Sequence, residues 1–490
     1  METLGMRSRH PLVNRAVVLF FLASGVICYL PSGRIGADEK PVSFMRDIAP
    51  ILKESCLACH DAKKRSGKLD MSTFERFAAG GNSDSPFVAG KPEESLLIEL
   101  ITTTGKKRMP PEGKGQRLTQ AQVDLVTRWI QQGARLDPDV DSKADLVREL
   151  RKRWQPPSLL DHYRFPVSVT ALAFTPDGKH IVAGGHHELL IWNIPERRLK
   201  KRIRTRSERS YGFVFAPDGM LIVAGARPGQ EGDVRVYNPN GPGQDANGTM
   251  VLDGVENPQV LVRHLLDTDD SMLCLALSAD GKRLAAAGCD RVVRVWDLTG
   301  GWNNPKLEQS IENHADWVLS LTFTPDGKHL LSASRDKTAK VWDLQAKESV
   351  MTFPDHQQPV YAVAASRDSK LGYSAGEDKQ IRIWNAAPEG KQVRALGGHT
   401  DSILRLIAHP GQALIASASA DKSVRLWNPD SGAAGHVLHG LSDQVYSLAF
   451  SPDGSQIAAG SYNGEVIVWN IADGKLVAKL NVSPGLAAAP

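Results

Sequence analysis

The sequence predicts a chain of several domains, in which a small all-α domain is followed by an all-β domain built as a seven-bladed propeller. Two observations support this fold class. A Cys-x-x-Cys-His motif at residues 56–60 lies between two amphipathic helical patterns. Farther along, seven aromatic residues recur at intervals of 42 to 59 residues, which is the mark of a repeat architecture. A chain of 490 residues has room for two or three domains.

The first 37 residues have the pattern of a secretory signal peptide. Three arginines, Arg7, Arg9 and Arg15, precede an uncharged and mostly apolar run at 16–30, and small residues ending at Ala37 offer a cleavage site. The run is shorter than the roughly 20 residues that cross a bilayer as a helix. We therefore predict an exported protein of the periplasm or cell envelope. Membrane anchoring through an uncleaved N-terminal segment is the alternative.

The composition is that of an ordinary globular protein. The net charge of +4 is small for this length and gives no reason to expect nucleic acid as a partner. Five cysteines, widely spread, do not form a disulfide framework. The predicted segments are a signal peptide at 1–37, a haem domain at 38–138, a charged linker at 139–166, the propeller at 167–482 and a disordered tail at 483–490.

Two helices frame the first domain. Apolar residues at helical spacing predict a helix over 43–55, directly before the cysteine motif. Thr119 and Gln122 form a capping box that begins a second helix, which an apolar stripe continues. We expect Phe44 and Trp129 to be the packing contact between the two helices.

The motif itself is Cys56-Leu57-Ala58-Cys59-His60, the attachment pattern of c-type haem. Two thiols three residues apart lie on one side of a helical turn and can add to the two vinyl groups of a porphyrin. His60 is then placed to ligate the iron. A thioredoxin-like redox pair needs a βαβ setting, and a zinc site needs further ligands nearby. Neither context follows in the sequence, so we predict one covalent haem c.

The iron needs a sixth ligand, and no histidine occurs between Asp61 and Asp161. Met71 and Met109 are the available thioethers. Met109 precedes two prolines, whose fixed φ makes a rigid, non-helical segment that can hold a sulfur against the haem. We therefore predict that His60 and Met109 bind the iron. A thioether ligand raises the reduction potential, which suits electron transfer.

These residues resemble the planctomycete-type cytochrome c domain. The resemblance implies covalent haem with histidine–methionine ligation, and it implies no substrate. It rests on a series of short motifs in a specific order. They are Phe44-x-x-Asp47-Ile48-x-Pro50-Ile51-Leu52, Cys56 to His60, Gly67-x-Leu69, Gly90-x-Pro92-x-x-Ser95-Leu96-Leu97, Met109-Pro110-Pro111 and Trp129-Ile130-x-x-Gly133-Ala134.

The second domain consists of repeated units that each end in an aromatic residue. Turns of the type Pro-Asp-Gly recur between apolar alternating stretches, because proline presets φ and glycine accepts a positive φ. The repeats resemble the WD-repeat family, which implies four strands per blade. Seven units then predict a seven-bladed propeller. The closing aromatics are Trp192, Tyr237, Trp296, Trp342, Trp384, Trp427 and Trp469.

Three units also match a hydrogen-bonded network of that family, in which a buried indole finds a partner inside the blade. We interpret these residues as structural rather than as a catalytic or metal cluster. They are His314, Ser332, Asp336 and Trp342; His356, Ser374, Asp378 and Trp384; and His399, Ser417, Asp421 and Trp427.

Four features of the propeller remain open. The long second interval places an insertion between Asn238 and Ser271. The basic stretch at 197–209 is interpreted either as a guarded edge strand or as a docking patch for an acidic partner. The strand expected at 475–482 completes the last blade, unless a strand from the N-terminal side, near 163–169, closes the ring instead. Cys274 is expected opposite Ala287, with Cys289 as a diagonal neighbour too far away for an unstrained disulfide, and both are expected to be buried thiols without chemistry.

These expectations favour an exported c-type cytochrome that carries one haem for one-electron transfer. Its partners are then a redox protein and a protein docked on the propeller, and we expect an electron carrier or binding protein rather than an enzyme. One alternative is a haem-dependent oxidoreductase with an active site in the propeller, for which His186 and His187 are the best-placed pair. The other is a scaffold protein with a structural haem. The propeller function rests on fold analogy.

Overall fold

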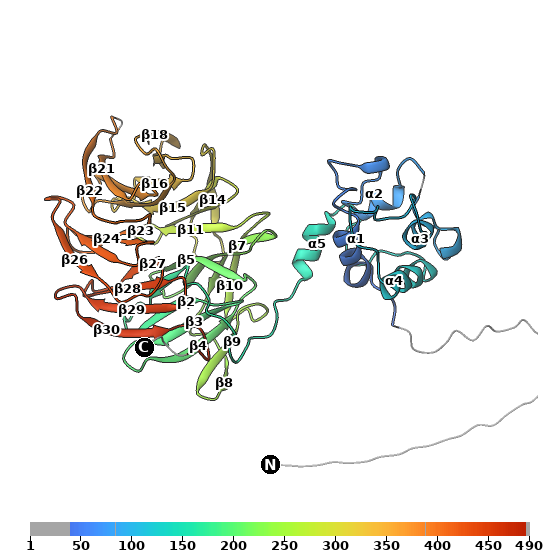
Figure 1. Ribbon diagram of the computed structural model, residues 1–490, viewed down its shortest axis with the longest axis horizontal. Helices are drawn as coiled ribbons and strands as arrows, with labels where there is room; N and C mark the ends of the chain where they lie inside the picture. Colours follow the sequence, from blue (N-terminus) through green and yellow to red (C-terminus); the bar gives the residue numbers. More distant parts are fainter. Residues whose placement is uncertain (1–39, 84, 388, 487–490) are drawn as a thin grey trace, which may run out of the picture. The chain divides into compact units, whose positions relative to one another are not determined.

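The computed structural model describes residues 40–83, 85–387 and 389–486 (Figure 1). The chain divides into two compact units, residues 1–152 and 153–490, and each is considered by itself. The predicted signal peptide at 1–37 lies outside the described residues. Within the described part, no helix combines the length and the apolar character needed to cross a membrane.

The first unit is a small helical domain, as predicted. Its helices and short helical turns, in chain order, are η1 (Phe44–Ile48), α1 (Ala49–Ser55), η2 (Ser66–Lys68), α2 (Phe74–Ala79), η3 (Pro92–Glu94), α3 (Leu96–Thr102), α4 (Gln120–Gln131) and α5 (Leu146–Arg153).

The predicted frame of this unit is confirmed. Thr119 and Gln122 form a capping box at the start of α4, each side chain bonding the backbone of the other. Phe44 and Trp129 are both buried, and their ring centroids lie 5.4 Å apart. Phe77 packs against both rings. The aromatic cluster thus fixes α4 against the segment that leads into the cysteine motif.

The segment predicted as a linker, 139–166, is divided between the two units, which corrects that prediction. Leu146 at the start of α5 is fully buried in the core of the first unit, and Val147 and Leu150 pack beside it. The amide of Leu146 also donates to Ser72. Three apolar residues on one face are enough to bury a helix whose other positions are charged.

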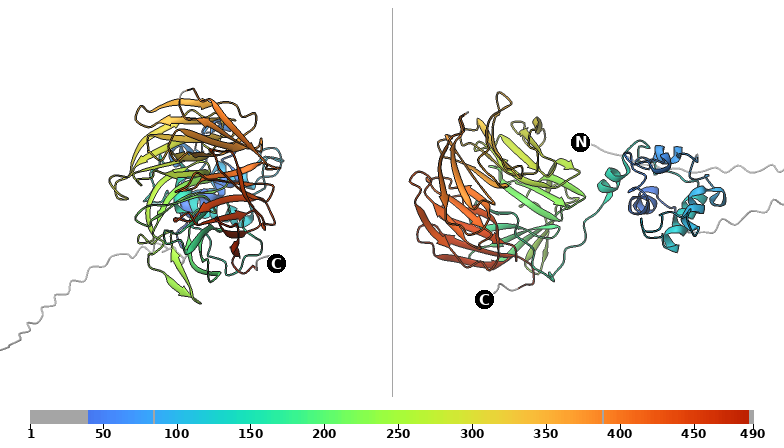
Figure 2. Two further views of the ribbon diagram at one scale, coloured as in Figure 1. Left: turned by 90° about the vertical axis from the view of Figure 1, so that its left-hand side faces the viewer. Right: turned by 45° about the horizontal axis from the view of Figure 1, so that its top comes forward.

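The second unit is a propeller of seven four-stranded antiparallel blades, numbered here in chain order (Figures 1 and 2). Blade 1 contains β1 (Leu172–Phe174), β2 (His180–Gly184), β3 (Glu188–Asn193) and β4 (Arg198–Arg204). Blade 2 contains β5 (Arg209–Phe215), β6 (Leu221–Arg227), β7 (Glu231–Tyr237) and β10 (Leu261–Thr268). Blade 3 contains β11 (Met272–Leu277), β12 (Arg283–Gly288), β13 (Val292–Asp297) and β14 (Lys306–Glu312). Blade 4 contains β15 (Val318–Phe323), β16 (His329–Ser334), β17 (Ala339–Asp343) and β18 (Glu348–Phe353).

Blade 5 contains β19 (Val360–Ala365), β20 (Leu371–Gly376), β21 (Gln380–Asn385) and β22 (Gln392–Gly397). Blade 6 contains β23 (Ile403–Ala408), β24 (Ile415–Ser419), β25 (Val424–Trp427) and β26 (Ala434–Leu438). Blade 7 contains β27 (Val445–Phe450), β28 (Gln456–Ser461), β29 (Glu465–Asn470) and β30 (Leu476–Asn481). The first strand of each blade is innermost, and all seven closing aromatics lie on third strands.

The insertion in blade 2 forms a hairpin, β8 (Gln244–Ala246) and β9 (Thr249–Asp253), on a neighbouring blade. Strand β9 pairs in parallel with β4 and extends blade 1 to six strands. Its Leu252 is fully buried. Strand β4 is therefore not an edge strand, and its interpretation as a guarded edge is wrong.

The ring closes without exchanging a strand between its ends. Strand β30 is the outer strand of blade 7, which is one of the two arrangements that the sequence left open. The segment before β1 runs along that blade instead, where the amide of Val169 donates to Ser461 and the amide of Val167 donates to the hydroxyl of Ser483. Ser483 is buried, so the predicted tail at 483–490 is corrected in its first residues.

Candidate functional site

The cysteine motif forms one tight turn at the end of α1. The amide of Cys56 still bonds Leu52 at 2.9 Å, as the last bond of the helix. The amides of Cys59 and His60 then both donate to the carbonyl of Cys56, at 3.1 Å each. The two thiols and the imidazole are thereby brought together on one short turn, as the sequence predicts.

Later residues hold this turn from the other side. The amide of Ser66 donates to the carbonyl of Cys59 at 3.0 Å, and the amide of Met71 donates to that of His60 at 2.7 Å. The ammonium of Lys64 also donates to the carbonyl of Ala58. Carbonyls left open at a helix end are satisfied in this way. The turn is therefore a fixed part of the domain.

The environment of Cys56 distinguishes it from a reactive thiol. Burial, and then the neighbouring Cys59, raises the pKa of the Cys56 thiol to about 11. A thioredoxin-like pair or another nucleophilic cysteine has a lowered pKa, because the thiolate is the reactive form. Both cysteines are free of disulfides. This arrangement leaves the two thiols, which no disulfide uses, available for covalent attachment.

The imidazole of His60 has no protein partner. Its buried Nδ1 lacks a hydrogen bond, and no described residue bonds its Nε2. In contrast, His314, His356 and His399 each use both ring nitrogens. An imidazole that the fold does not consume is what a metal ligand requires.

The two methionines differ in their surroundings. Met71 is 2% exposed and belongs to the hydrophobic core, so packing accounts for its thioether. Met109 is half-buried, lies in a bend after α3 and is fixed through its amide, which donates to Leu100 at 2.8 Å. Among the described residues, no hydrogen bond or shared core contact joins Met109 to the cysteine turn. Its role as a ligand stays a prediction.

These residues fit a covalently attached haem. Two thiols on one turn match the two vinyl groups on one edge of a porphyrin, and a free imidazole follows directly. Across the described ranges, no group of three or more His, Cys, Asp or Glu side chains is arranged to hold a bare metal ion. A haem needs no such group, because the porphyrin itself supplies four nitrogen ligands.

In the propeller, the predicted hydrogen-bonded networks of blades 4, 5 and 6 are confirmed. In blade 5, the indole N–H of Trp384 donates to Ser374 at 2.9 Å, and that hydroxyl lies 2.7 Å from His356 Nε2. His356 Nδ1 lies 3.0 Å from Asp378. Blades 4 and 6 repeat the pattern with nearly the same distances. These histidines are structural.

The two histidines proposed for an active site in the propeller lie ring to ring, with centroids 4.7 Å apart. His187 is buried, its Nδ1 lies 3.2 Å from the carbonyl of Arg206, and its ring packs against Trp154. Burial, and then His186, lowers the pKa of His187 to about 4. His186 is exposed. One ring nitrogen of His187 is therefore already placed against a backbone carbonyl, and among the described residues no third His, Cys, Asp or Glu joins the pair in a possible metal site.

Two arginines of the basic stretch at 197–209 form ion pairs inside the protein. Arg202 makes two hydrogen bonds of 2.7 Å to Glu188, which also accepts a bond from Tyr163. Arg206 pairs with Glu231 at 3.0 Å. Sequence reasoning missed these pairs, because the carboxylates and Tyr163 lie outside the stretch.

The fold and the cysteine turn define a two-domain protein in which a cytochrome c-like domain precedes a WD-repeat propeller. Residues 56–113 match the family Planctomycete cytochrome C. Residues 157–193 and 258–297 match the WD domain, G-beta repeat, and residues 317–487 match the first β-propeller of IFT122. The chain thus joins a planctomycete-type cytochrome c domain to a WD-repeat propeller.

Curated relatives resemble part of the chain. Coronin-7 of Mus musculus is 42% identical over 102 residues, which is 19% of this chain and 11% of that protein. Nuclear distribution protein PAC1 of Coccidioides posadasii (strain C735) is 25% identical over 337 residues, 62% of this chain and 66% of that protein. Protein groucho of Drosophila melanogaster is 26% identical over 149 residues, 30% of this chain and 18% of that protein. The chain spans about a ninth of the length of Coronin-7.

Proposed function

We propose that the protein is an exported c-type cytochrome that transfers single electrons between proteins and uses its propeller as a docking platform. The observation that carries this proposal is the turn of Cys56, Cys59 and His60, with its two free thiols and its free imidazole. The family match over residues 56–113 supports it independently.

Each site residue has a defined role in this proposal. Cys56 and Cys59 would hold the haem through thioether bonds, and His60 would ligate the iron. Met109 would supply the second protein ligand, since packing in the core accounts for Met71. When bound, the haem would supply a one-electron redox centre between a donor protein and an acceptor protein, and histidine–methionine ligation favours a high potential.

The chain contributes rigidity around that centre. The backbone bonds to the carbonyls of Cys59 and His60 fix the turn before a cofactor binds. The core beneath it, with Leu52 and Leu57, excludes water from one side of Cys56. A fixed and partly dry environment tunes the potential of a haem.

The propeller part of the proposal rests on its class. WD-repeat propellers in general mediate protein–protein interactions, and this one is a complete seven-bladed ring. The partner proteins, export and the location in the periplasm or cell envelope all belong to the proposal.

Optical spectra of two matched methionine variants test the ligand set. Met109→Ala is expected to keep the haem attached but to lose the weak near-infrared band of a thioether–iron bond in the oxidised protein. Met71→Ala is the control, and we expect it to keep that band while the core cavity costs about 2–5 kcal/mol of stability. A band that survives in Met109→Ala and disappears in Met71→Ala would reverse the assignment.

A further inference from the structure

The centre of the propeller holds an arginine that reaches across the ring. Arg405 lies on β23, the innermost strand of blade 6. Its Nε donates to the carbonyl of Tyr446 in blade 7 at 3.1 Å. Its Nη2 donates to the carbonyls of Tyr211 in blade 2, at 3.2 Å, and Thr170, next to blade 1, at 3.4 Å. One guanidinium therefore bonds backbone from both sides of the point where the ring closes.

The charge of Arg405 has no carboxylate partner among the described residues. Desolvation lowers the pKa of Arg405. Among the described residues, only the thiol of Cys274, if it were ionised, would raise that pKa again. That thiol is neutral, because burial raises its pKa to about 12. In contrast, the buried Arg202, Arg227 and Arg235 each bond a carboxylate. Arg405 is half-buried and its bonded partners are neutral carbonyls, so an anion placed beside it would supply the charged partner that its guanidinium lacks among the described residues.

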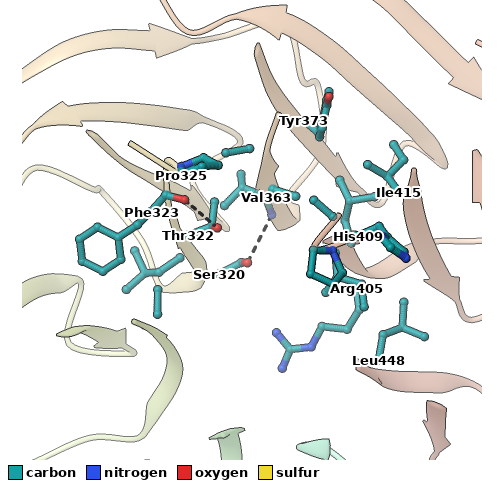
Figure 3. Close-up of a pocket in the computed structure, with 18 of the residues that line it drawn as sticks. Ser320, Thr322, Phe323, Pro325, Val363, Tyr373, Arg405, His409, Ile415 and Leu448 are labelled. Carbon is teal, nitrogen blue, oxygen red and sulfur yellow. Dashed lines mark hydrogen bonds between the residues drawn. The ribbon is translucent and has the colours of Figure 1, made fainter. Parts of the chain in front are cut away.

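Arg405 also lines a cavity of about 1010 Å³ in the centre of the propeller (Figure 3). About half of its wall is apolar, with Val363, Ile415 and Leu448 among the lining residues, and the rest is polar. Its size is at the upper end of the range typical of small-molecule sites, which combine apolar walls with a few polar groups.

The cavity holds hydrogen-bond donors that are still available, and its two carboxylates lie in turns. The Nη1 of Arg405 makes no hydrogen bond within the described chain. The hydroxyl of Ser320 accepts from the amide of Val363 at 3.3 Å, so its own hydrogen is available as a donor. Two lining carboxylates, Asp368 and Asp430, lie in turns, and Asp368 already accepts from Ser366 and Lys370.

We propose that this cavity is a binding site for a carboxylate, with the guanidinium of Arg405 as its recognition group. The carboxylate belongs either to a small organic acid or to an acidic side chain that a docked protein inserts. The Nη1 of Arg405 is suited to this task, because no described residue uses its N–H groups and a charge-assisted hydrogen bond to a carboxylate is a strong one. The inference does not depend on haem, and its failure leaves the haem proposal untouched.

The test uses the full-length exported protein and two probes, sodium succinate and a penta-glutamate peptide. Each is titrated at constant ionic strength against sodium chloride, with thermal stability and calorimetric binding as readouts. A ligand that binds only the folded state raises the melting temperature in a saturable way. Saturable binding of succinate identifies a small acid, and binding of the peptide alone identifies an inserted side chain.

Three variants assign any binding to Arg405. Arg405→Gln is expected to abolish the saturable effect. Arg405→Lys keeps the charge without the paired donors and is expected to weaken binding about tenfold or more. It also covers the case in which Arg405→Gln does not fold. Arg294→Gln, which removes a half-buried arginine bonded to Asp290, is the matched control and should bind as the wild type does.

Two results would overturn the proposal. One is that neither probe gives a saturable effect on the wild-type protein. The other is that Arg405→Gln, or Arg405→Lys if the first variant does not fold, binds as tightly as the wild type. In both cases Arg405 acts only as a tie between blades.

Discussion

Blades 4 to 6 and blades 1 to 2 satisfy their buried polar groups by different chemistry. In blades 4 to 6, a chain of hydrogen bonds runs from a tryptophan through serine and histidine to aspartate, as in Trp342, Ser332, His314 and Asp336. In blades 1 and 2, buried ion pairs take this place, as in Glu188 with Arg202. The comparison shows that a propeller can keep its geometry while the polar network inside a blade changes from a tryptophan–serine–histidine–aspartate chain to arginine–carboxylate pairs.

The difference has a local cause in each blade. In blade 1, Val182 stands where blades 4 to 6 have serine, and the buried indole N–H of Trp192 has no partner. In blade 2, Arg227 and Glu231 occupy the serine and aspartate positions relative to Tyr237, and they bond each other at 2.8 Å.

The largest effect is expected from breaking the ion pair of blade 1. Glu188 is almost fully buried and holds Arg202 by two bonds, so Glu188→Gln leaves a buried cation without its partner. We expect a loss of about 3–5 kcal/mol in the free energy of unfolding, measured by urea denaturation. The control is Glu348→Gln, which changes an exposed glutamate of β18 and should have no measurable effect. A loss below about 1 kcal/mol at Glu188 would mean that the pair contributes little.

A smaller effect is expected from the hydrogen-bonded network. Ser374→Ala removes the acceptor of the Trp384 indole and the partner of His356. Leaving buried polar groups unsatisfied costs about 1–3 kcal/mol. Ser349→Ala, at an exposed position of β18, is the matched control. If Ser374→Ala and Ser349→Ala have the same stability, the network does not stabilise the blade.

The two kinds of network should also differ in their response to acid. Burial lowers the pKa of His399 below its ordinary 6.5, although the bond to Asp421 opposes this shift. For Asp421, hydrogen bonds from Ser423 and His399 outweigh burial and lower the pKa to about 2. Both folded-state pKa values lie below the unfolded values. The stability they contribute is therefore complete above pH 6.5 and falls as the pH decreases, first through His399 and then through Asp421.

The ionic network of blade 2 responds at lower pH. The bonds from Arg206 and Arg227 outweigh burial and lower the pKa of Glu231 below 4.5. The stability that Glu231 contributes is therefore complete above pH 4.5 and is lost only at lower pH. Hydrogen exchange resolved by blade should therefore show blade 6 losing protection between pH 6.5 and 4.5 while blade 2 does not. Equal losses in both blades over this range would contradict the comparison.

Repeats and periodic patterns made most of the fold predictable. The helical spacing before Cys56 and the capping box at Thr119 depend on near neighbours, and the structure has both. The seven blades follow from a pattern repeated seven times. The network of blade 5 could be predicted because its histidine, serine and aspartate keep fixed distances from Trp384.

The parts that sequence reasoning missed depend on contacts between distant segments. Strand β4 was expected at an edge, and nothing near it indicates that β9 covers it from another blade. The charge density of 141–153 concealed the apolar face of α5, whose partners lie near Ser72. For the candidate site, the motif predicted the turn itself. The position of Met109 relative to it depends on a long loop that no local pattern defines.

The central claim is that the turn of Cys56, Cys59 and His60 carries a covalent haem, and an intact mass tests it most directly. The protein should be produced in cells that export it and operate a c-type haem attachment pathway, then measured under denaturing conditions. We predict a mass that exceeds the mature polypeptide by one haem, and the polypeptide mass alone for the double variant Cys56→Ala/Cys59→Ala. A wild-type protein with the mass of the bare polypeptide would contradict the account.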